Sequence, residues 1–170
     1  MNIVLKKLGS RLARFLTRPR EIYEQFSVLT QEQLDEALQP GDLILVEGNS
    51  RVSTAIKYLT QSTWSHVCMY VGAQDDGRGF VVEADLVEGV ISSPVSKYVG
   101  YNLRICRPHQ LTEPDRQAII QFVQERLGHR YDTRNIVDLV RYLVPTPPVP
   151  SQYRRRLLAL GSGDPTRAIC

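Results

Sequence analysis

Trp64-Ser-His-Val-Cys-Met-Tyr-Val-Gly72 is the first of two apolar runs that decide the fold of this chain. The second run is Phe80-Val-Val-Glu-Ala84, and a turn over residues 72–77, rich in glycine and aspartate, separates the two. Short apolar runs joined by such a turn are typical of a β-hairpin. Because side chains alternate between the two faces of a strand, the first run places four residues on one face: Trp64, His66, Cys68 and Tyr70.

The second run contains an acid, Glu83, among apolar residues. A buried carboxylate without a partner is costly, so the sequence predicts a specific partner for it. If Gly72 pairs with Gly77, His66 lies directly opposite Glu83, at a Cβ separation of about 4.5–5.5 Å. Such a pair could be the base and the orienting acid of a catalytic triad, or a buried pair that only stabilises the sheet. The hairpin alone leaves both interpretations open.

The rest of the chain predicts an α+β protein, in which helices pack against an antiparallel sheet. Further strands are expected over 42–46, 88–92 and 101–107, and helices over 50–60, 113–127 and 133–143. Thr30 and Gln33 form a capping-box pattern, which predicts one more short helix through Leu38. We expect two parts: an N-terminal helical segment over 1–39, amphipathic and basic at 1–20, and one compact domain over 40–170.

The formal net charge of +3 is unevenly distributed along the chain. Residues 1–20 carry six basic residues and no acid, whereas residues 21–150 carry 11 basic and 17 acidic residues. An acidic body does not fit a nucleic-acid-binding domain, which would spread Lys and Arg over one face. Apolar residues of the segment 3–18 recur at helical spacing, opposite its basic residues. This helix could dock on the domain or lie on an anionic membrane surface, and both alternatives stay open.

The three cysteines, Cys68, Cys106 and Cys170, suggest no disulfide framework. A reducing compartment is therefore expected, which makes the chain cytoplasmic, with a possible peripheral position on the inner face of a membrane. No run of 18 apolar residues is present that would span a bilayer. The histidines and cysteines lack the spacing of metal ligands, so we expect no metal and no cofactor.

Five segments occur in an order that resembles a known family. They are Leu38-Gln-Pro-Gly-Asp-Leu-Ile-Leu45, the stretch from Trp64 to Gly72, Val82-Glu-Ala84, Leu103-Arg-Ile-Cys-Arg-Pro108 and Leu127-Gly-His-Arg-Tyr-Asp132. Together they resemble the circularly permuted papain-like amidases, the YiiX-like branch of the NlpC-type cysteine hydrolases. The resemblance covers residues 38–170 and implies a permuted papain-like (NlpC-type) fold.

The resemblance also implies a catalytic triad in the chain order histidine, acid, cysteine. It gives His66 as the general base, Glu83 as the acid that orients the base, and Cys170 as the nucleophile. Tyr131 matches a tyrosine near the site in the family, and Trp64 fits the core or the wall of a cleft; both are candidates for contact with substrate or oxyanion. The implied function is a thiol hydrolase or acyltransferase that acts on an amide or ester bond of a peptide- or lipid-linked substrate.

The end of the sequence departs from the family pattern. The sequence stops at Cys170, whereas family members continue into a helix whose amino terminus lowers the pKa of the nucleophile. We therefore expect this sequence to be a fragment, truncated at its C-terminus. The alternative is a catalytically inactive papain-like scaffold that acts as a binding or membrane-adaptor module.

Overall fold

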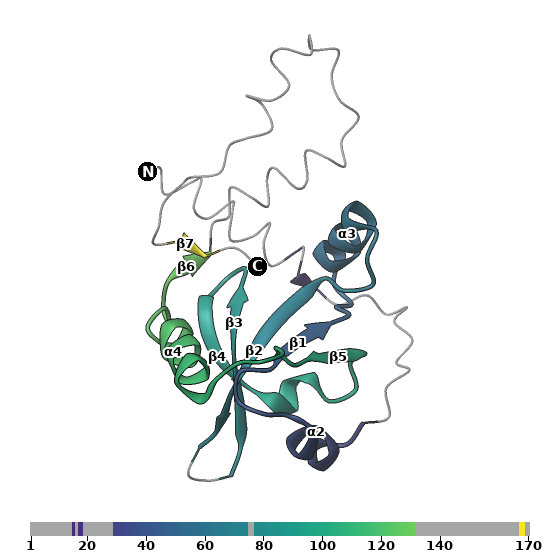
Figure 1. Cartoon of the computed structure of the whole chain (residues 1–170). Helices are drawn as coiled ribbons and strands as arrows, with labels where there is room; N and C mark the ends of the chain where they lie inside the picture. Colours follow the sequence, from purple (N-terminus) through teal and green to yellow (C-terminus); the bar gives the residue numbers. More distant parts are fainter. Residues whose placement is uncertain (1–14, 16, 19–28, 75–76, 132–166, 169–170) are drawn as a thin grey trace.

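The computed structural model describes residues 15, 17–18, 29–74, 77–131 and 167–168. Within them, an antiparallel five-stranded sheet has the order β4-β3-β2-β1-β5 (Figure 1). Its strands are β1 Leu43–Val46, β2 His66–Ala73, β3 Gly79–Asp85, β4 Gly89–Pro94 and β5 Leu103–Cys106. The helices are α2 Gln31–Ala37, α3 Arg51–Thr60, α4 Glu113–Gln124 and the 3-10 helix η1 Val95–Tyr98. The α+β class predicted from the sequence is confirmed.

A second pair of strands continues the chain beyond α4. β6 Arg130–Tyr131 and β7 Arg167–Ala168 pair in parallel. The backbone just before β6 also bonds to β4, since the Val90 amide donates to the carbonyl of His129 at 2.8 Å. β6 therefore lies beside β4, at the side of the sheet opposite β5 (Figure 1).

The β2–β3 hairpin forms as predicted, but the predicted register was wrong by two residues. Cys68, and not His66, lies directly opposite Glu83. The turn is longer than expected, because the last pair of residues before it is Ala73 and Gly79 and not Gly72 and Gly77. A β-bulge between Tyr70 and Gly72 then shifts the pairing again. Gly72 has a φ of 109°, a left-handed value that glycine adopts without strain.

A shift of two residues keeps every side chain on its predicted face, because the side-chain period of a strand is two. His66 and Glu83 therefore still share a face, as diagonal neighbours instead of direct partners. Diagonal neighbours lie within reach of long side chains.

The hydrophobic core lies on this same face of the sheet. Leu34 of α2 and Val95 of η1 pack there against residues from the three central strands. The cluster of buried core residues consists of Leu34, Leu38, Ile44, Val46, Cys68, Tyr70, Val81, Val95 and Tyr98. The helix α2 therefore shares a core with the sheet, while the expected boundary between residues 39 and 40 stays a prediction.

The connection from β4 to β5 crosses the sheet. β4 pairs with β3 and β5 pairs with β1, so residues 95–102 must pass over the central strands. The helix η1 lies in this crossover and contacts both α2 and β3. The crossover closes one side of the core and brings the side chains of η1 close to β2 and β3.

Helix starts follow the sequence signals. Thr30 and Gln33 form the predicted capping box at the start of α2, and Ser50 caps α3 by accepting a hydrogen bond from the Ser53 amide.

The predicted helix over 133–143 lies outside the described residues, as does most of the segment 3–18. Of that segment, the Phe15 ring contacts Arg51 of α3, whose guanidinium lies 4.0 Å from the ring centroid. Among the described helices, none has the length and apolar character needed to cross a bilayer.

The motif Pro40-Gly41-Asp42 anchors the start of β1. The Asp42 side chain is 2% exposed and accepts hydrogen bonds from Arg107 Nε at 2.9 Å and Arg107 Nη2 at 2.7 Å. It also accepts one from the Gln39 amide at 2.8 Å. This bidentate ion pair connects the start of β1 to the residue that follows β5.

Replacing this arginine should destabilise the fold. Arg107→Met is expected to lower the free energy of unfolding by about 1–3 kcal/mol, because the Asp42 carboxylate would stay buried without its charged donor. Urea denaturation of the full chain measures the change. Arg104→Met is the matched control, because Arg104 lies exposed on β5, and its cost should stay below about 0.5 kcal/mol. Equal stability of the two variants would contradict the anchoring role of Asp42.

Candidate active site

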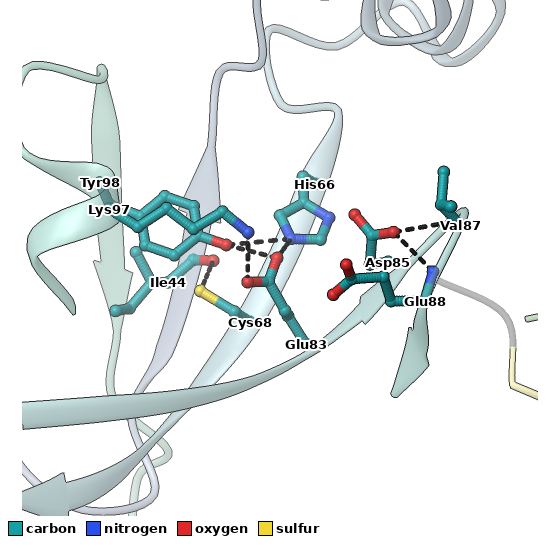
Figure 2. A network of polar contacts seen from close by, with 9 residues as sticks. All are labelled: Ile44, His66, Cys68, Glu83, Asp85, Val87, Glu88, Lys97 and Tyr98. Atoms are coloured by element: carbon teal, nitrogen blue, oxygen red, sulfur yellow. Dashed lines mark hydrogen bonds and ion pairs between the residues drawn. The ribbon is translucent and has the colours of Figure 1, made fainter. Parts of the chain in front are cut away.

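His66 and Glu83 meet at the edge of the core face. His66 is the first residue of β2, and Glu83 lies in the middle of β3. The His66 Nε2 atom lies 2.9 Å from Glu83 Oε2, which is hydrogen-bond distance (Figure 2). The predicted contact between the two side chains is therefore present, although it is reached diagonally across the two strands.

Two further donors bind the Glu83 carboxylate, and both come from η1 (Figure 2). The Tyr98 hydroxyl donates to Oε2 at 2.6 Å, and Lys97 Nζ donates to Oε1 at 2.6 Å. Ser93 of β4 adds a side-chain hydrogen bond. The Glu83 side chain is only 3% exposed, so the carboxylate depends on these groups instead of water.

The donors determine the charge of Glu83. Burial by itself raises the pKa of this carboxyl group, but hydrogen bonds from His66, Lys97, Ser93 and Tyr98 outweigh burial and hold the pKa far below its ordinary range. Glu83 is therefore ionised at neutral pH. The stability that it contributes is present above its ordinary pKa of about 4.3 and is lost as the pH falls through its lowered value.

An ionised Glu83 fixes the tautomer of His66. A carboxylate only accepts hydrogen bonds, so Nε2 of the imidazole must carry the proton that faces Glu83. In neutral His66 the lone pair is then on Nδ1, the nitrogen on the other side of the ring. The pair thus presents a basic nitrogen directed away from Glu83, which is what a general base requires.

Tyr98 fixes the position of both partners. Its hydroxyl lies 3.3 Å from His66 Nε2 while it donates to Glu83, and its ring stacks beside the imidazole, with centroids 6.4 Å apart. Burial, then the nearby Cys68 and Glu83, raise the pKa of Tyr98 far above its ordinary value. The hydroxyl therefore keeps its proton and remains a donor.

Lys97 and Tyr98 were not predicted as site residues. They follow Glu83 by 14 and 15 residues and belong to a short 3-10 helix without a periodic pattern. Their only sequence signal is a Lys-Tyr pair in the segment that joins two predicted strands. The crossover between β4 and β5, which brings this pair to Glu83, depends on the strand order of the whole sheet.

Three other candidate residues lie within the described part of the chain. Cys68 is a buried member of the core, with its sulfur 3.8 Å from the Ile44 carbonyl oxygen (Figure 2). Trp64 is half-buried in the segment just before β2. The backbone of Tyr131 pairs with Ala168 of β7. Cys170 lies outside the described residues, so its approach to His66 stays a prediction.

No group of three or more histidine, cysteine, aspartate or glutamate side chains that could hold a metal ion occurs in the described part of the chain. The carboxylate of Glu83 is instead surrounded by hydrogen-bond donors from protein side chains. The contact between His66 and Glu83 fits acid–base chemistry centred on an oriented imidazole.

Comparison with known protein families gives a match. A family model described as "Permuted papain-like amidase enzyme, YaeF/YiiX, C92 family" matches residues 37–142, more than half of the chain. The matched region runs from the end of α2 through α4 and includes His66, Glu83, Lys97 and Tyr98. No curated protein gives a match. The family match agrees with the α+β fold and with the resemblance of the five ordered segments, and the chain therefore belongs to the YaeF/YiiX, C92 family of permuted papain-like amidases.

Proposed function

We propose that this chain is a thiol hydrolase or acyltransferase that acts through Cys170, His66 and Glu83. The observation that carries the proposal is the hydrogen bond between His66 Nε2 and a buried, ionised Glu83. It leaves Nδ1 as the basic nitrogen, and a neighbouring thiol is the group whose proton such a nitrogen takes in papain-like chemistry. Membership of a cysteine amidase family supports the same assignment.

In the proposed reaction, His66 Nδ1 takes the proton of the Cys170 thiol, and the thiolate attacks the carbonyl carbon of the substrate. The tetrahedral intermediate collapses when the imidazolium returns the proton to the leaving amine or alkoxide, so that the C–N or C–O bond breaks and a thioester remains. His66 then deprotonates a water molecule or another acceptor, which attacks the thioester. The acyl group leaves with the acceptor, and the sulfur recovers its proton.

Glu83 acts on this reaction through His66. It holds the imidazole in one tautomer and orientation and stabilises the imidazolium that forms when the thiol is deprotonated. Tyr131 and Trp64 are proposed to contact the substrate or the oxyanion. Trp64 is two residues before His66, and the matched family region includes both Trp64 and Tyr131.

The proposed substrate carries an amide or ester bond on a peptide or a lipid. The basic, amphipathic segment over residues 1–20 supports a site of action near an anionic membrane surface. A cytoplasmic position on the inner face of that membrane would bring the segment close to such lipids. This part of the proposal rests on the charge pattern of the sequence.

Thiol labelling tests the proposed pair of Cys170 and His66. With an alkylating reagent, Cys170 of the full chain should react quickly, with a pH midpoint well below the value of about 8.5 for a free cysteine. His66→Ala should slow this reaction at pH 7 by at least about 10-fold, because the thiolate would lose its imidazolium partner. Mass spectrometry of the Cys170 peptide separates its labelling from that of Cys68 and Cys106.

The matched control for this test is His109→Ala, because His109 is exposed and follows β5. This variant should label like the wild type. If Cys170 reacts at the rate of an ordinary thiol and His66→Ala changes nothing, the catalytic proposal is wrong. The chain would then be an inactive scaffold that serves as a binding or membrane-adaptor module.

A second substitution tests the role of Glu83. Glu83→Gln keeps the shape of the side chain but removes its charge, so the imidazolium should lose stabilisation and Cys170 labelling at pH 7 should slow by about 10-fold or more. Glu113→Gln removes a carboxylate from an exposed ion pair on α4 and serves as the control. Unchanged labelling in a folded Glu83→Gln variant would show that the carboxylate does not assist the base.

A further inference from the structure

The charge balance around Glu83 points to a role for Lys97 that the proposed triad does not include. The two carboxylate oxygens have different partners: Oε2 binds His66 and Tyr98, whereas Oε1 binds Lys97 at 2.6 Å. Besides His66 Nε2, Lys97 Nζ is thus a second protonatable nitrogen that binds the same carboxylate. It reaches Glu83 from η1, beside Tyr98, whereas the imidazole comes from β2 (Figure 2).

We propose that Lys97 is a positioning residue that balances the charge of Glu83 and thereby sets the pH range in which His66 acts. The proposal rests on the proposed function of His66 as a general base. With Lys97 in place, the Glu83–Lys97 pair has no net charge, so an imidazolium at His66 experiences an orienting carboxylate whose field is partly cancelled. Without Lys97, the same imidazolium would face an uncompensated anion.

The burial of the two partners decides how the charge of Lys97 acts. The Glu83 side chain is 3% exposed, but the Lys97 side chain is 43% exposed. As for Asp42 and Arg107, loss of the exposed partner would leave a buried carboxylate with one charged donor fewer and would cost stability. The charge of Lys97 also acts on a carboxylate that is shielded from water, and through that carboxylate on the imidazole, so a shift of the pH profile is the readout that distinguishes the functional role.

The other titratable side chains drawn in Figure 2 do not replace Lys97. Cys68 comes from β2, Tyr98 from η1, and Asp85 and Glu88 from the end of β3 and the following turn (Figure 2). Of these groups, Asp85 and Glu88 have carboxyl side chains, which supply no positive charge in either protonation state, and Tyr98 keeps its proton. Asp85 also accepts hydrogen bonds from the Val87 and Glu88 amides, which hold it in the turn. Among the side chains labelled in Figure 2, Lys97 is the one that supplies a positive charge to Glu83 besides the imidazole.

Removing this charge should move the whole pH profile in one direction. A nearby cation favours the deprotonated form of every group around it, so its loss raises the pKa of thiol and imidazole alike. The Cys170 labelling profile has one limb set by the thiol and one set by the imidazole. Both limbs should therefore move to higher pH in Lys97→Met, by about 0.5 to 1 pH unit. A purely structural role would lower the thermal stability without moving either limb.

The experiment measures Cys170 labelling of the full chain across pH in the wild type, Lys97→Met, Lys97→Gln and Lys97→Arg. Lys97→Gln keeps a hydrogen-bond donor without charge and should shift both limbs like Lys97→Met, whereas Lys97→Arg should restore the wild-type profile. Lys57→Met is the matched control, because it removes a lysine that pairs with Glu47 instead of Glu83. Near-ultraviolet circular dichroism shows that each variant is folded.

The outcomes separate the two proposals. If the wild type has an activated thiol and Lys97→Gln leaves both limbs of the labelling profile at their wild-type pH, the role of Lys97 is overturned and the triad stays intact. A shift of equal size in Lys57→Met would also overturn it, since the effect would then follow net charge alone. A wild type without an activated thiol would overturn both proposals, because no imidazole-assisted reaction would remain for Lys97 to adjust.

Discussion

The buried carboxylate of Glu83 is the constraint on which the arrangement of this site depends. It lies on the core face of the sheet and would be unstable there as an isolated charge. Four side chains from three different elements besides its own strand surround it: His66, Ser93, Lys97 and Tyr98. Each donates a hydrogen bond, and each is thereby held in place. The energetic requirement of one acid thus fixes the position of an imidazole, a tyrosine and a lysine.

The site and the hydrophobic core share residues, and this explains how the orientation is maintained. Tyr98 is 3% exposed and packs in the core cluster with Val95 and Cys68, while its hydroxyl binds Glu83. Close packing leaves its ring little freedom, so the hydroxyl is fixed with respect to the imidazole. A general base needs its nitrogen within a few tenths of an ångström of a productive position, and packing supplies this more reliably than an exposed loop.

The parts of the site that follow from local pattern could be predicted from the sequence. Alternation along two apolar runs was sufficient to place His66 and Glu83 on one face, because a register shift of two residues preserves the face. The register itself could not be predicted, since the bulge at Tyr70 and Gly72 and the length of the turn are not encoded in periodicity. Lys97 and Tyr98 reach Glu83 only because the chain crosses from β4 to β5, and this crossover depends on the pairing of β5 with β1. Cys170 was proposed as the nucleophile from the family resemblance alone, since no pattern in the residues singled it out.

The most direct test of this account is the ionisation of Glu83 itself. The carboxyl carbon of Glu83 can be followed by carbon-13 NMR during an acid titration of the full chain, with Glu83→Gln to identify the resonance. The resonance should keep the chemical shift of an ionised carboxylate down to a pH well below the ordinary midpoint of about 4.3, because four donors stabilise the charge. A midpoint at or above that value would contradict it, since Glu83 would then be a buried acid that its neighbours do not hold in the ionised form.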